Sequence, residues 1–146
     1  MKKFISVALG LALLFLVFYG CDRSKDESGP FDVKAGEIFT VKVSMEDSGA
    51  IKSMALTVYS DDNAFEIIDG KWLNHKAVIA DFNRENKDAA IAFKEETNYC
   101  GEIFEFTVKA KKDMTIIDEM FSVDAVLKNG EQKLTGNGIK LSYVKD

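Results

Sequence analysis

Apolar side chains after residue 30 recur at every second position of the chain. This period places alternate side chains on opposite faces of a strand, so it predicts strands that are buried on one face. The segments with this pattern are 39–46, 53–59, 91–93, 103–109, 121–127 and 139–143. Their predicted inward residues are Phe39, Val41, Val43, Met45, Met54, Leu56, Val58, Ile91, Phe93, Phe104, Phe106, Val108, Phe121, Val123, Ala125, Leu127, Ile139, Leu141 and Tyr143. Ile103 is predicted to face the other way.

Turn-forming residues separate these segments. They are Asp47-Ser48-Gly49, Asp69-Gly70, residues 98–101, Asn129-Gly130 and Gly136-Asn137-Gly138. No stretch has the pattern of a long amphipathic helix. Short strands between polar turns predict an all-β fold, an antiparallel sandwich of two sheets.

The N-terminus has the pattern of a secretory signal. Two lysines follow Met1, and residues 4–19 are apolar apart from a few small residues. Gly20-Cys21 resembles the end of a bacterial lipobox, in which the thiol is acylated and the chain is cut before the cysteine. We therefore expect a signal peptide at 1–20, a lipidated Cys21 and an exported domain on the outer side of the cytoplasmic membrane or at the cell surface. The alternative is an uncleaved membrane anchor, because the apolar run is close to the shortest that spans a bilayer.

Residues 22–30 contain no aliphatic or aromatic side chain and end in Gly-Pro. Such a segment cannot contribute to a core, so it is interpreted as a flexible tether. Fully extended, it reaches roughly 30 Å. The folded domain is then predicted to span residues 31–146.

The charge balance excludes one class of partner. The chain of 146 residues carries 19 basic and 24 acidic side chains, a net charge of −5. Removal of Lys2 and Lys3 with the signal lowers the basic count from 19 to 17, and the net charge to −7. A nucleic-acid binder needs a basic surface, so nucleic acid is not an expected partner.

Candidate catalytic groups are few. His75 is the only histidine and is interpreted as a surface residue. Cys100 has no disulfide partner if Cys21 is lipidated, and a passive cysteine is favoured over a functional thiol. The acidic pairs are Asp61-Asp62, Glu95-Glu96 and Asp118-Glu119, which suit solvated turns; a calcium site at Asp61, Asp62 and Asn63 is the alternative. Neither an enzyme nor a bound cofactor or metal is therefore expected.

Five stretches resemble the cohesin domain of cellulosome scaffolds and cell-surface anchors. Residues 35–43 and 49–59 resemble its first long strands, and residues 61–68 resemble the tight turn that follows. Residues 101–109 are similar to its Gly-Glu-Leu-Phe strand, and residues 137–139 to its closing strand. The resemblance implies a nine-stranded jelly-roll sandwich that binds the calcium-loaded dockerin module of another protein and has no catalysis of its own.

The same resemblance implies a docking face on one sheet. Ser53 and Ala55 stand where cohesins often carry Asn and Asp, and Glu95 stands where they often carry a recognition Glu. Thr57 and Tyr59 extend this face with a hydroxyl and an aromatic ring. An ordinary solvated sheet face is the competing interpretation.

A carbohydrate-binding lipoprotein is the alternative function, because jelly-roll sandwiches also bind polysaccharide. Binding to a crystalline polymer needs coplanar exposed rings. The available rings, those of Tyr59, Trp72 and Phe82, come from three separate segments, which disfavours this function.

Overall fold

The computed structural model describes residues 30–130, 132–135 and 137–146. Every pair of neighbouring strands in them is antiparallel. The strands are β1 (Phe31–Val33), β2 (Ile38–Asp47), β3 (Ala50–Ser60), β4 (Phe65–Trp72), β5 (Ile79–Asn83), β6 (Asp88–Asn98), β7 (Gly101–Ala110), β8 (Met114–Ile116), β9 (Phe121–Asn129), β10 (Gln132–Thr135) and β11 (Asn137–Lys145). One turn of 3₁₀ helix, η1 (Asp118–Met120), leads into β9.

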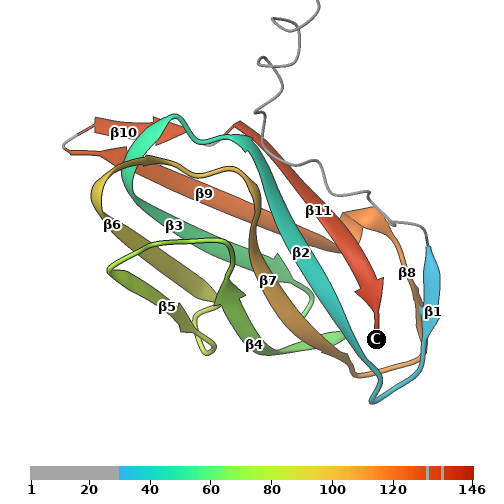
Figure 1. Ribbon diagram of the computed structural model, residues 1–146. Coiled ribbons are helices and arrows are strands. Elements are labelled where there is room, and N and C mark those ends of the chain that lie inside the picture. The colour runs from blue at the N-terminus through green and yellow to red at the C-terminus, as the bar shows by residue number, and fades with distance from the viewer. Residues whose placement is uncertain (1–29, 131, 136) are drawn as a thin grey trace, which may run out of the picture.

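The strands form two sheets that pack face to face (Figure 1). One has five strands in the order β10-β9-β3-β6-β5, and the other has four in the order β11-β2-β7-β4. A short ladder of β1 and β8 lies beside them. The predicted all-β sandwich is confirmed, with nine strands in its two main sheets.

Aromatic side chains fill the space between the sheets. Phe39 contacts Phe65 and Phe121 with ring centroids 6.1 and 6.0 Å apart, and Phe106 contacts Phe121 at 5.8 Å. Such ring contacts add to the large apolar area that each side chain buries. All the residues predicted to face inward are buried or partly buried.

Ile103 does not face outward as predicted. Its side chain is 0% exposed. The cause is a bulge in β7: Val43 of β2 pairs with Phe104 and Ser44 pairs with Glu102, so Ile103 has no partner across the ladder. An extra residue breaks the alternation of faces, and here it turns Ile103 into the core next to Phe104.

Asp69-Gly70 does not form the predicted turn. Both residues lie inside β4, after a register shift between Ile67 and Asp69. A Cβ atom at Gly70 would lie 2.7 Å from Phe104 Cζ and 2.9 Å from Phe82 Cγ, so the glycine leaves room for two rings. Close packing against the strand, rather than a change of chain direction, explains this glycine.

Cys100 is partly buried, and Cys21, the other cysteine of the sequence, lies outside the described residues, so the lipidation of Cys21 stays a prediction. Tyr99 beside it is buried, and its hydroxyl donates a hydrogen bond to the carbonyl of Ile103 at 2.8 Å. Burial raises the pKa of this phenol. The predicted signal peptide, lipidated Cys21 and tether up to residue 29 lie outside the described residues, and within the described part no helix is long and apolar enough to cross a membrane.

Candidate functional site

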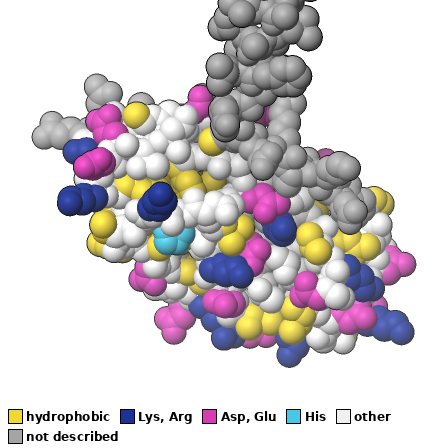
Figure 2. Space-filling view, viewed as in Figure 1, with side chains coloured by type: hydrophobic (Ala, Val, Ile, Leu, Met, Phe, Trp, Pro, Cys, Tyr) yellow, Lys and Arg dark blue, Asp and Glu magenta, His cyan; other side chains and the backbone are white. Residues whose placement is uncertain are grey.

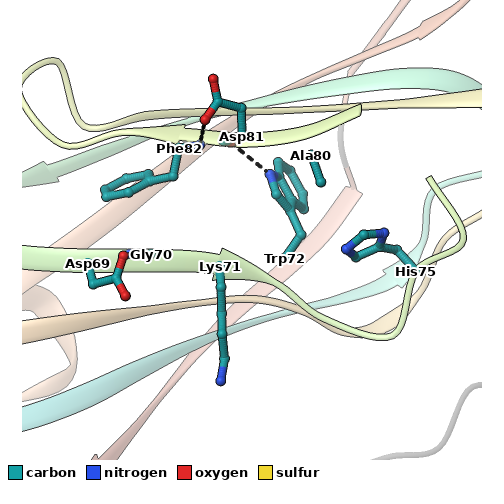
Figure 3. Close-up of a pocket in the computed structure, with 8 residues that line it drawn as sticks. All are labelled: Asp69, Gly70, Lys71, Trp72, His75, Ala80, Asp81 and Phe82. Carbon is teal, nitrogen blue, oxygen red and sulfur yellow. Dashed lines mark hydrogen bonds between the residues drawn. The ribbon is translucent and has the colours of Figure 1, made fainter. Parts of the chain in front are cut away.

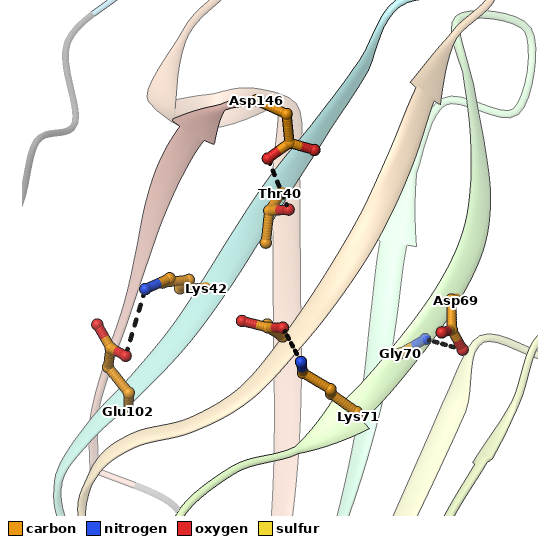
Figure 4. Close-up of polar contacts among 8 residues, drawn as sticks. Thr40, Lys42, Asp69, Gly70, Lys71, Glu102 and Asp146 are labelled. Carbon is orange, nitrogen blue, oxygen red and sulfur yellow. Dashed lines mark hydrogen bonds and ion pairs between the residues drawn. The ribbon is translucent and has the colours of Figure 1, made fainter.

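Charged side chains on the outer face of the four-stranded sheet form ion pairs with one another. Lys42 Nζ lies 3.4 Å from Glu102 Oε2, and Lys71 Nζ lies 2.8 Å from Glu105 Oε1 (Figure 4). The hydrogen bond from Lys71 to Glu105 raises the pKa of the lysine. Viewed from the side of this sheet, the surface of the molecule carries a mixture of basic and acidic side chains (Figure 2). A partner that docked here would have to replace these internal pairs.

The outer face of the five-stranded sheet differs in composition. Strand register places its outward side chains in rows across the sheet. These residues, which we call the open face, are Ile79, Asp81 and Asn83 of β5, Asp88, Ala90 and Ala92 of β6, Ser53, Ala55, Thr57 and Tyr59 of β3, and Ser122, Asp124, Val126 and Lys128 of β9. No ion pair joins side chains of the open face to one another.

Small uncharged residues occupy the centre of the open face. Ala55 pairs with Ala90 on one side and Val126 on the other, and Ser53 pairs with Ala92. Two large side chains stand at its opposite ends, because Tyr59 is 50% exposed and Ile79 is 60% exposed. A flat centre between exposed apolar anchors suits a protein partner better than the ion-paired sheet does.

The structure brings together four of the five predicted binding residues. Ser53, Ala55, Thr57 and Tyr59 share one face of β3. Glu95 stands apart, because Ile51 pairs with Thr97 and Ser53 pairs with Ala92, which leaves residues 93–96 outside the regular register. Glu95 is exposed near the Ser53 end, and six residues of strand, roughly 20 Å, separate Ser53 from Tyr59.

The sequence interpretation did not single out the flanking residues of the open face. Asp124 and Val126 could have been found, since they alternate with the inward residues of 121–127. Asp88 and Ala90 continue the alternation of Ile91 and Phe93 in the same way. Ile79 gave no such signal because β5 is exposed along nearly its whole length.

A cleft of about 380 Å³ lies between β4 and β5 (Figure 3). The Trp72 indole crosses it and donates a hydrogen bond from Nε1 to the carbonyl of Asp81 at 3.1 Å. The Lys71 amine and the Asp81 carboxylate point away from the cleft on opposite sides. His75 lies at one end, where its Nδ1 accepts a hydrogen bond from the Ala77 amide at 3.2 Å. The cleft therefore shows no converging set of acid, base and nucleophile.

The rings considered for sugar binding do not form a platform. Trp72 is 7% exposed and packs on Phe104 with ring centroids 5.1 Å apart. Phe82 is partly buried against the same Phe104 ring at 5.7 Å. Of the three predicted rings, only that of Tyr59 is well exposed.

The turn considered for calcium is occupied by its own contacts. Asp61 Oδ1 accepts a hydrogen bond from the Asn63 amide at 2.9 Å. The Asp62 carboxylate pairs with Lys87, whose hydrogen bond lowers the pKa of Asp62, and Lys111 donates to the Asp62 carbonyl. Within the described ranges, no group of three or more His, Cys, Asp or Glu side chains is arranged to hold a metal ion.

Comparison with known proteins finds a likeness in fold but none in sequence. No family model matches the chain, and no curated protein matches it in sequence. Among solved structures, a chain of the Coh-OlpC-Doc435 complex, a type I cohesin–dockerin complex from Clostridium thermocellum, matches with a TM-score of 0.50 and 13% identity. The match covers 85% of this chain and 98% of that chain. At this identity the likeness shows the fold alone, which is a cohesin-like β-sandwich.

Proposed function

We propose that the protein is a non-catalytic recognition module, tethered to the membrane, that binds a dockerin-bearing protein at the cell surface. The contrast between the two sheet faces carries the proposal. The four-stranded sheet pairs Lys42 with Glu102 and Lys71 with Glu105 on its outer face, whereas the open face presents Tyr59 and Ile79 around a flat, uncharged centre. The cohesin-like fold supports a docking role for such a face.

The tether is part of the proposal. The lipobox-like Gly20-Cys21 and the polar segment 22–30 would hold the domain outside the cell, clear of the membrane surface. Lipidation of Cys21 would then keep a captured partner near the cell.

Capture of secreted proteins by residues 31–146, with and without a calcium chelator, tests this function. A dockerin is expected to fold around calcium, so chelation should abolish its capture by unfolding the partner. The thermal melt of the present domain should stay unchanged. A parallel assay on insoluble cellulose addresses the alternative function, because retention on cellulose without any captured dockerin protein would replace docking by polysaccharide binding.

Tyr59 is the residue whose loss should weaken docking most. Interface energy concentrates in a few aromatic anchors, so Tyr59→Ala should weaken binding by about 2 kcal/mol or more, roughly thirtyfold. Tyr59→Phe retains the ring and should lose much less. Glu95→Ala should also lose less, since Glu95 lies outside the regular register. Isothermal titration with the captured dockerin measures these differences, and equal affinities of the Ala variant and the native chain would count against the open face.

A further inference from the structure

Two carboxylates of the open face flank one residue of its central strand. Thr57 of β3 pairs with Asp88 of β6 on one side and with Asp124 of β9 on the other. Both aspartates are exposed. Adjacent strands lie about 4.8 Å apart, so the backbones of the two aspartates are roughly 10 Å apart with Thr57 between them.

No cation of the described chain is paired with either carboxylate. Lys87, next to Asp88 in sequence, is engaged by Asp62. Lys128 pairs with Ser53 rather than with Thr57. It lies four residues along β9 from Asp124, so the two residues are roughly 13 Å apart. On the β5 side, the row continues with the neutral Asn83. The Thr57 end of the open face is therefore negative, and its charge is left for a partner.

An aromatic ring stands next to this acidic row. Tyr59 lies two residues from Thr57 on the same face of β3 and is half exposed. A cationic side chain over Thr57 would face both carboxylates and could lay its alkyl stem against the Tyr59 ring. In the opposite direction along β3 come Ala55 and Ser53, which leave space for a close approach.

We infer that the partner of the open face presents a helix whose Lys or Arg sits over Thr57, between Asp88 and Asp124. Small apolar residues four and eight positions away on that helix lie over Ala55 and Ser53. The spacing agrees, because alternate residues of a strand are about 6.8 Å apart and four residues of a helix rise about 6 Å. The inference rests on the proposed function in taking the open face as the docking surface.

Two cross-linked helical peptides of equal length and equal apolar positions test this inference. One carries Lys and the other Glu at the position over Thr57, and each carries a fluorescent label. Binding to the full chain in detergent is measured by fluorescence anisotropy at low and at high salt. The Lys peptide should bind at least about tenfold more tightly at low salt, and salt should reduce this preference.

Substitutions that remove charge identify the residues responsible for the tighter binding of the Lys peptide. Asp88→Asn with Asp124→Asn should abolish it, and circular dichroism should confirm that this double variant stays folded. Glu102→Gln with Glu105→Gln removes the same charge from the other sheet face and should leave the preference intact. Equal binding of the two peptides, binding of neither, or the same loss in both double variants would overturn the inference.

The outcome is separable from that of the proposed function. If a captured dockerin protein binds the Asp88→Asn, Asp124→Asn variant as tightly as the native chain, the cationic helix is wrong and docking stands. If the Lys preference holds and no dockerin protein is captured, the charge recognition stands and the dockerin assignment fails.

Discussion

At the scale of single residues, Phe106 is the strongest test of the sandwich core. It is 0% exposed, lies in β7 and contacts Phe104 and Phe121. Phe106→Ala should cost about 3 to 5 kcal/mol in the free energy of unfolding, because the lost ring leaves a cavity that the core cannot fill. Denaturant melts measure this cost.

Its neighbour Glu105 is the matched control, since it points to the opposite face and makes only a surface ion pair with Lys71. Glu105→Ala should cost less than about 1 kcal/mol. A larger cost for Glu105→Ala than for Phe106→Ala would mean that the facing of β7 is shifted by one residue.

Tyr143 should make the stability of the domain depend on pH in the alkaline range. Its hydroxyl donates a hydrogen bond to the Asp118 carbonyl at 2.8 Å, and burial raises its pKa to about 12. An unfolded tyrosine ionises near pH 10, so this phenol contributes stability in full below about pH 10. The contribution is lost as the pH rises through about 12.

Urea melts at increasing pH from about 8 to about 12 should therefore show a falling free energy of unfolding above about pH 10. Tyr143→Phe removes one ionising group and should reduce the fall. A decline as steep in this variant as in the native chain would exclude Tyr143 as a contributor; Tyr99, whose pKa is also raised, would still ionise in both proteins.

At the scale of elements, side chains of the edge strands β4 and β5 occupy some of the backbone groups of these strands. Asp69 Oδ1 accepts the Gly70 amide and Asp81 Oδ1 accepts the Phe82 amide, each at 2.8 Å. The Trp72 indole occupies the Asp81 carbonyl. Unpaired backbone groups at a sheet edge are templates for pairing with another chain. These contacts should therefore reduce the pairing of β4 and β5 with a second molecule.

Asp69→Ala with Asp81→Ala should accordingly increase self-association, measured by light scattering at rising protein concentration. Asp88→Ala with Asp124→Ala removes the same charge away from these two edges and should have a smaller effect. If both double variants associate equally, loss of charge rather than exposure of the edges explains the result.

The elements also show how far the sequence could predict the structure. Long alternating strands such as β2, β3 and β7 could be predicted because one face is buried and the other is solvated. β5 could not, because nearly all its residues are exposed, and β4 was hidden by an Asp-Gly pair that usually marks a turn. The inward turn of Ile103 depends on a bulge that only the pairing with β2 reveals.

The candidate site was predictable only in part, because it also depends on how the strands pair. Ser53, Ala55, Thr57 and Tyr59 share a face by alternation within one strand. Their neighbours on β6 and β9 depend on strand order and register, which distant parts of the chain determine together.

At the scale of the whole molecule, the proposed anchor at Cys21 would decide where recognition takes place. Cys21→Ser removes the thiol that lipidation requires, so the precursor should accumulate unprocessed and without lipid. Metabolic labelling with a fatty acid and the mobility of the product measure this outcome. Gly20-Cys21 would be an ordinary signal-peptide end if the variant were processed normally to a lipid-free product.

The β1–β8 ladder would give a domain anchored in this way a mechanical property. For a chain held at its N-terminal end, a pull on a bound partner enters the fold at Phe31, and β1 is only three residues long. Besides that ladder, it is held by the buried Val33 side chain, by the Phe31 ring on Phe39, and by hydrogen bonds to Asp32 from the Thr115 hydroxyl and the Lys145 amine. This strand should give way before the long ladders of the sandwich. Its release would free residues 31–33, about 10 Å of chain, while Ala35 and Gly36 stay hydrogen-bonded to Asp113 and Ala110 and the open face keeps its shape.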